Sequence, residues 1–159
     1  EGTPTGTDEL VAQARALPPA PGTFDPDEEA FATPGDMQRK IDAALEAQGA
    51  SRPDSMAGYV RVIIESFARR YARAIGELTQ ATGRAPDQLN LVGGGARNQL
   101  LCDLTAQIAG VTVVRGPIEA STFGSLLAQL ETIGALAAHE RASVIAASAQ
   151  THVHTPSRG

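Results

Sequence analysis

The residues best suited to do chemistry form the run Leu91-Val92-Gly93-Gly94-Gly95-Ala96-Arg97-Asn98. Three glycines in it separate a short apolar stretch from a sequence with helical periodicity. A glycine-rich turn lets the backbone come close to a ligand, and the helix after it presents unpaired amide protons at the positive end of its dipole. Such a turn suits the binding of a nucleotide.

Two common nucleotide-binding motifs are excluded, because the sequence lacks residues that each of them requires. A dinucleotide fingerprint needs a third glycine where this chain has Asn98, and an acidic residue about 20 positions further on. Val113-Val114-Arg115 supplies no acid there. A phosphate-binding P-loop needs a Gly-Lys-Ser/Thr ending, and the chain's one lysine, Lys40, lies far away. Spacing alone therefore leaves a tight turn without a ligand as an open alternative.

The elements that position this turn are predicted from hydrophobic periodicity. Residues 89–92 and the β-branched residues 111–114 read as strands, and residues 98–109 between them read as a helix. Strand, glycine turn, helix and strand make one βαβ unit, whose two strands are expected to be parallel with a right-handed crossover. A further helix is predicted over residues 121–136.

Upstream, two helices are predicted with their caps. Asp36 is the expected N-cap of a helix over residues 37–47, and Gly83 is the expected C-cap of a long helix that begins at residue 54 or 55. Phe67 and Tyr71 on the long helix are expected in the core. Its polar residues are expected to form a solvated face; they are Arg61, Glu65, Arg69, Arg70, Arg73 and Glu77.

Both ends of the chain are poor in large apolar residues. Residues 1–36 read as an extended arm with one short helix over 8–17, anchored by Phe24 and Phe31 and in need of upstream chain to pack against. Residues 142–149 read as a weak helix, and residues 152–159 as a free tail that leaves two histidines in solvent.

Composition excludes several classes of protein. The 13 basic and 18 acidic side chains give a net charge of -5, which argues against a nucleic-acid partner. No apolar run approaches the ~20 residues of a membrane span. The single cysteine, Cys102, excludes an internal disulfide and is expected to be a buried apolar residue. These features predict a cytoplasmic protein, and the missing initiator methionine suggests an excised piece.

The wider sequence around the glycines resembles the C-terminal domain of the FGGY family of carbohydrate kinases. The resemblance rests on residues 90–104, continues through 109–113 and 116–124, and extends to Ile64-Glu65-Ser66-Phe67-Ala68 in the long helix. These segments occur in the order and at the spacing of the family. The resemblance covers residues ~10 to 137, and its specificity lies in the combination of motifs.

The resemblance implies an α/β protein with an actin-like ATPase (ribonuclease H-like) fold. The chain would supply part of the C-terminal domain, with a short parallel βαβ unit and several packed helices. On this reading residues 1–36 are an extended arm, residues 37–137 the nucleotide-binding core and residues 138–159 a C-terminal tail.

The family motif also implies roles for individual residues. Gly94 would lie under the adenosine part of ATP, and Asn98 would hydrogen-bond it. Gly93, Gly95 and Ala96 would shape the same loop.

Residues beside the loop have structural expectations. Glu119, Ala120 and Gly124 match a segment that packs next to it, with Gly124 allowing the close approach of a helix. Arg97 could contact phosphate or ribose, but a solvent-facing or salt-bridged arginine is the default expectation.

The whole enzyme implied by the resemblance transfers the γ-phosphoryl group of ATP to a ketose hydroxyl, with Mg²⁺ neutralising charge. The sugar would bind mainly to an N-terminal domain, and the catalytic aspartate would precede residue 1. No catalytic residue and no metal ligand are therefore predicted here, and the chain alone is expected to be inactive. The alternatives are a non-catalytic nucleotide-sensing or interaction module and a stand-alone flavodoxin-like binding domain. The oligomeric state stays open.

Overall fold

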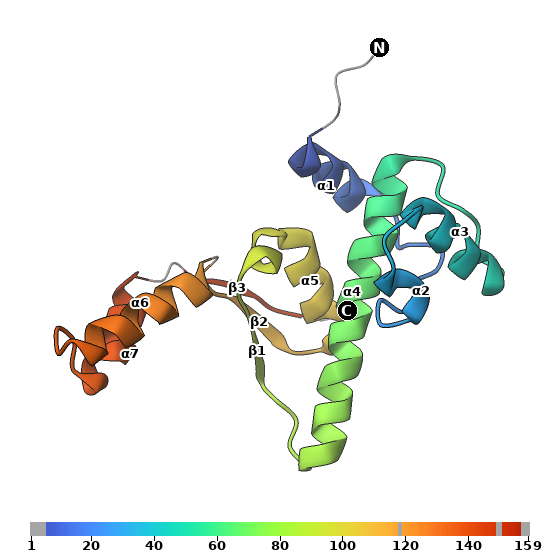
Figure 1. Cartoon of the computed structure of the whole chain (residues 1–159). Coiled ribbons are helices and arrows are strands. Elements are labelled where there is room, and N and C mark those ends of the chain that lie inside the picture. Colours follow the sequence, from blue (N-terminus) through green and yellow to red (C-terminus); the bar gives the residue numbers. More distant parts are fainter. Residues whose placement is uncertain (1–5, 118, 149–150, 157–159) are drawn as a thin grey trace. The chain divides into compact units, whose positions relative to one another are not determined.

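A computed structural model describes residues 6–117, 119–148 and 151–156 (Figure 1). Their contacts divide the chain into two compact units, Glu1–Ala85 and Pro86–Gly159, which are described separately. The expected α/β class is confirmed. Within the described ranges, no helix combines the length and the apolar character that crossing a membrane requires.

The first unit is helical. Its elements are α1 (Thr7–Ala16), α2 (Glu29–Ala32), α3 (Met37–Ala47) and α4 (Met56–Thr82). Asp36 caps α3 as expected, by accepting a hydrogen bond from the Arg39 amide at 3.1 Å. Gly83 ends α4 at φ 67°, in the left-handed region that favours glycine.

The core of this unit packs the described part of the arm (residues 1–36) against α3 and α4. Phe24 packs with Ile41, Tyr59 and Val62, and its ring stacks on Phe31 at a centroid distance of 4.3 Å. The expected anchors are therefore the observed ones. They pack against α3 and α4 of the same chain, whereas the sequence predicted that this arm needs upstream chain.

The polar face of α4 is not wholly solvated, so that prediction is wrong for Arg61 and Glu65, which are 8% and 3% exposed. Glu65 accepts hydrogen bonds from the Ala20 amide at 3.0 Å and from Arg61 at 3.3 Å. Arg61 also donates to the Ala14 carbonyl at 3.4 Å. Burial is tolerated because each charge has an ionic partner and a backbone partner.

Phe67 departs from prediction in the opposite direction, because its side chain is 39% exposed. Tyr71, also expected in the core, is half-buried. The apolar stripe of α4 is therefore wider than the surface that the described chain covers.

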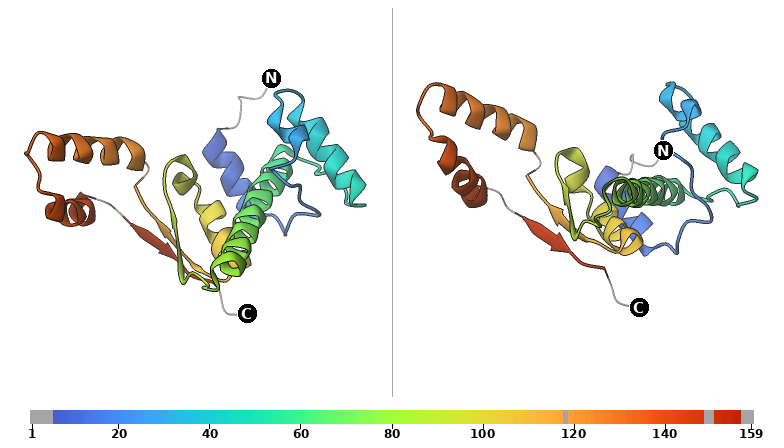
Figure 2. Two further views of the ribbon diagram at one scale, coloured as in Figure 1. Left: turned by 60° about the horizontal axis from the view of Figure 1, so that its bottom comes forward. Right: turned by 90° about the horizontal axis from the view of Figure 1, so that it is seen from below.

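The second unit is a small mixed sheet with helices. Its elements are β1 (Gln88–Leu91), the 3₁₀ helix η1 (Gly94–Arg97), α5 (Gln99–Ala109), β2 (Thr112–Arg115), α6 (Ala120–Thr132), the 3₁₀ helix η2 (Ala138–Glu140), α7 (Arg141–Ser148) and β3 (His152–His154). In both views of Figure 2, α6 and α7 lie side by side. Arg141 fastens them with two hydrogen bonds to Glu131, each 2.7 Å long.

The predicted parallel βαβ unit is present. Strands β1 and β2 pair in parallel, from Gln88 opposite Thr112 to Leu91 opposite Arg115. Helix α5 covers one face of this pair, where Cys102, Ala106 and Val113 form a core with Leu89 and Leu91 packed against it.

The C-terminal segment corrects the prediction of a free tail. β3 pairs antiparallel with β2, so that His154 lies opposite Val113 and His152 opposite Arg115. Nδ1 of His154 lies 2.5 Å from Oδ1 of Asp103 on α5. The pairing satisfies backbone groups along the edge of β2 that the sheet would otherwise leave open, a gain that local composition does not reveal. The remainder of the predicted tail, residues 157–159, lies outside the described residues.

Candidate functional site

The glycine turn begins with a backbone conformation that only glycine adopts easily. Gly93 has φ 74° and ψ −157°, and its amide donates to the Pro117 carbonyl at 3.2 Å. The Gly116 amide donates in turn to the Leu91 carbonyl at 2.9 Å. These two bonds hold the loops after β1 and β2 side by side, at the carboxyl ends of the parallel strands. That edge is where open α/β sheets bind ligands.

The middle of the turn is open. A Cβ atom added to Gly94 would meet nothing within 4 Å, and Gly94 is exposed. Ala96 is fully buried beneath the turn, and its amide bonds to the Gly93 carbonyl at 3.0 Å. The backbone at Gly94 is therefore accessible from solvent, while the buried Ala96 anchors the same turn in the interior.

Asn98 connects the turn to α5. Its side-chain oxygen accepts a hydrogen bond from the Leu101 amide at 3.0 Å and so caps the helix. The cap uses the oxygen of the amide, which leaves the Nδ2 group able to donate to a ligand. Gly93, Gly94, Gly95, Ala96 and Asn98 thus form one continuous turn, as predicted, while their role toward a nucleotide stays a prediction.

The residues beside the turn meet their expectations in part. Arg97 is salt-bridged as expected, with Nη2 3.8 Å from Oε1 of Glu119. Gly124 departs from its expectation, because a Cβ added there would meet nothing within 4 Å, so no helix among the described residues approaches it closely. Cys102 is fully buried, and desolvation raises the pKa of its thiol, which makes it a packing residue rather than a nucleophile.

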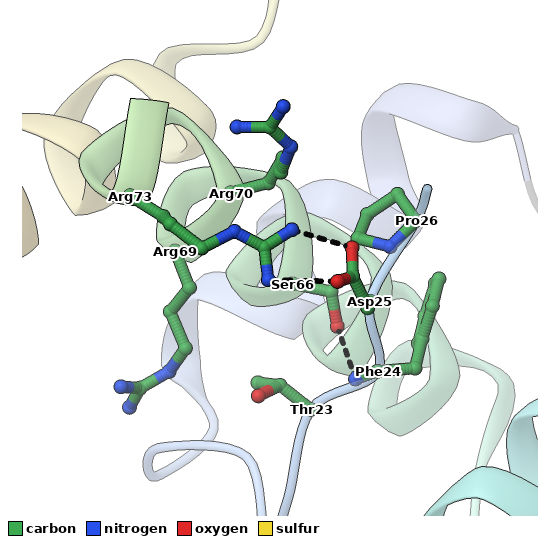
Figure 3. Close-up of a pocket in the computed structure, with 8 residues that line it drawn as sticks. All are labelled: Thr23, Phe24, Asp25, Pro26, Ser66, Arg69, Arg70 and Arg73. Carbon is green, nitrogen blue, oxygen red and sulfur yellow. Dashed lines mark hydrogen bonds and ion pairs between the residues drawn. The ribbon is translucent and has the colours of Figure 1, made fainter. Parts of the chain in front are cut away.

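Sequence reasoning missed a cavity of about 240 Å³ in the first unit (Figure 3). Its lining comes from the loop before α2 and from one face of α4: Thr23, Phe24, Asp25, Pro26, Ser66, Arg69, Arg70 and Arg73. The Ser66 hydroxyl accepts a hydrogen bond from the Phe24 amide at 3.1 Å. The Arg73 guanidinium binds both oxygens of the Asp25 carboxylate, at 2.7 and 2.8 Å. At these positions the sequence predicted only an extended arm and the polar face of a long helix.

The charges around this cavity neutralise one another. The Arg73 guanidinium lowers the pKa of Asp25 from 3.8 to about 2. Arg70 pairs with Asp27, and Arg69 pairs with Glu65 at 3.1 Å. Arg70 and Arg73 therefore fasten the loop to α4, while Arg69 pairs within α4 itself. Since these charges already have partners, the glycine turn is the stronger candidate for a ligand site.

The described residues contain no group of three or more His, Cys, Asp or Glu that could hold a metal ion.

Comparison with known proteins identifies the family to which this chain belongs. Residues 3–132 match the model of the FGGY family of carbohydrate kinases, C-terminal domain. The chain therefore belongs to that family, and the glycine turn lies within the matched residues.

Among individual proteins, the chain is similar to rhamnulokinases. It is 39% identical over 148 residues to one from Klebsiella pneumoniae subsp. pneumoniae, covering 92% of this chain and 30% of the relative. A rhamnulokinase of another Klebsiella pneumoniae strain is 41% identical over 128 residues, covering 80% and 26%. That of Bacteroides thetaiotaomicron is 35% identical over 130 residues, covering 82% and 27%. The chain thus spans less than a third of the length of these relatives.

Proposed function

We propose that this chain is the nucleotide-binding part of an ATP-dependent sugar kinase that phosphorylates a ketose such as L-rhamnulose in the cytoplasm. The observation that carries the proposal is the open turn Gly93–Asn98 at the carboxyl end of β1, which is held by backbone and capping hydrogen bonds. It supports nucleotide binding because it joins an accessible backbone to a capped helix N-terminus. Membership of the FGGY family and similarity to rhamnulokinases support the reaction and the sugar.

The turn would act on the nucleotide in three ways. The bare backbone at Gly94 would let the adenosine part lie against the chain without a side chain between them. The Nδ2 group of Asn98 would donate a hydrogen bond to it. The N-terminus of α5 would add the favourable field of the helix dipole.

ATP itself supplies the phosphoryl group, and this chain's contribution is to hold and orient it. Positioning is a large part of phosphoryl-transfer catalysis, because the transferred group needs alignment more than covalent chemistry. We assign no catalytic base to the aspartates of this chain, since none lies in a motif of that kind. The sugar pocket, the base and the Mg²⁺ site would belong to the rest of the enzyme, as part of an actin-like ATPase fold. The chain alone would be inactive.

The test uses the chain and the complete reading frame that encodes it. Calorimetric titration of the chain should detect ADP binding in the millimolar range but no L-rhamnulose binding and no turnover. The complete protein should phosphorylate L-rhamnulose with ATP in preference to other ketoses. A complete protein that binds ATP and phosphorylates no sugar would instead support a non-catalytic nucleotide-binding module.

A further inference from the structure

Arg97 is the last residue of η1 and directly precedes the cap residue Asn98. Its side chain is 68% exposed, and its one ionic contact in the described chain is the 3.8 Å pair with Glu119, itself 74% exposed. Glu119 is the N-cap residue of α6, which follows β2. The pair therefore bridges the two loops at the carboxyl edge of the parallel strands.

This ion pair contributes little to the fold. Both partners are exposed, their separation is near the limit for an ion pair, and water screens such contacts. The guanidinium is therefore free to exchange one anion for another at small cost. An arginine is well suited to that exchange, because its planar fork binds carboxylates and phosphates alike.

The charge around the turn favours an anion although the chain as a whole is acidic. The chain has a net charge of -5, yet residues 88–101 and 112–122 contain two cations, Arg97 and Arg115, and one carboxylate, Glu119. Arg115 ends β2 directly opposite Leu91, where β1 ends. Both cations thus belong to the segments that form the ligand-binding edge of the strands.

We propose that Arg97 contacts the phosphate groups of the bound nucleotide and that Glu119 competes with those phosphates for it. The inference rests on the proposed function, because it requires a nucleoside diphosphate or triphosphate at the turn. Without nucleotide, Glu119 holds the guanidinium. With nucleotide bound, the guanidinium moves to the phosphates. Because its ion pair with Glu119 must break first, the Glu119 carboxylate weakens nucleotide binding.

The test is a double-mutant cycle on ADP affinity, with adenosine as a ligand that has no phosphate. Arg97→Ala should weaken ADP binding ~3–10-fold, the range for a partly exposed charged hydrogen bond, and leave adenosine binding unchanged. Glu119→Gln should tighten ADP binding ~2–5-fold, because the competing carboxylate is removed. The Glu119→Gln effect should vanish when Arg97 is already alanine.

A matched control removes the same charge elsewhere. Arg39→Ala, at an exposed position of α3, should leave ADP affinity at the wild-type value. Thermal unfolding should give the same midpoint for all variants, since the pair is not structural. If Arg97→Ala and Arg39→Ala have equal effects, or if the Glu119→Gln effect persists without Arg97, the inference fails while the proposed function stands. If the wild-type chain binds no ADP into the millimolar range, the proposed function itself fails.

Discussion

Asn98 has two separable tasks, and substitutions can divide them. The side-chain oxygen caps α5 by accepting from the Leu101 amide at 3.0 Å, and the proposed nucleotide contact uses the Nδ2 group on the same amide. Asn98→Ala removes both groups. Asn98→Asp keeps an oxygen in the capping position and replaces the donor with an acceptor.

The expected magnitudes follow from that division. Losing the cap in Asn98→Ala should cost ~1 kcal/mol of unfolding free energy. Asn98→Asp should stay within ~0.5 kcal/mol of the wild type, because aspartate caps as well as asparagine and its charge favours a helix N-terminus. ADP affinity should fall ~5-fold in Asn98→Ala, for one lost hydrogen bond, and at least as far in Asn98→Asp, where a carboxylate faces an anionic ligand.

Two assays measure the two tasks. Urea unfolding followed by circular dichroism reports the cap, and calorimetric titration with ADP reports the contact. If Asn98→Asp destabilises the chain as much as Asn98→Ala does, the side-chain oxygen is not the cap. If Asn98→Asp binds ADP as tightly as the wild type, the Nδ2 group does not contact the nucleotide.

Three further predictions concern the scaffold. Glu65→Ala should lower the unfolding free energy by ~3–5 kcal/mol in urea, because it leaves the Arg61 charge buried without its partner. The pair of Asp25 with Arg73 should stabilise the fold fully above the unfolded-state pKa of 3.8 and progressively less as the pH falls toward about 2, so Asp25→Asn should flatten the acid limb of a stability–pH profile. Gly93→Ala should cost ~1–3 kcal/mol in the same urea assay, because its backbone conformation is nearly confined to glycine.

Each of these variants has a matched control. Glu46→Ala removes an exposed carboxylate whose pair with Arg52 is 3.3 Å long, and should cost little. Asp8→Asn removes an exposed aspartate from α1 and should flatten the acid limb less than Asp25→Asn does. Gly94→Val should be nearly neutral for stability, because its Cβ has open space, while it weakens ADP binding. Loss of stability in the controls comparable to that in the test variants would contradict the account.

Local signals predicted the elements well. Asp36 and Gly83 cap the helices they were expected to cap, because both use short-range hydrogen bonds or backbone freedom that depend on few neighbours. The strand–turn–helix–strand order was predicted for the same reason, since the apolar period changes sharply at Gly93. The five residues predicted for the site lie in one turn, and their role toward a nucleotide stays a prediction.

Tertiary effects account for what the sequence did not reveal. Arg61 and Glu65 satisfy each other and the backbone of the arm, a combination that helical periodicity cannot show. The segment His152–His154 becomes a strand because the edge of β2 is available, not because its composition demands it. Asp25 was predicted only as part of the extended arm, because its partner Arg73 lies 48 positions away in sequence.

Binding of a nucleotide by the turn Gly93–Asn98 is tested most directly by chemical-shift mapping with ADP on the isotopically labelled chain. The largest shifts should fall on the amides of this turn and of the first turn of α5. Shifts concentrated instead on the cavity lined by Thr23–Pro26, or no shifts at all into the millimolar range, would contradict it.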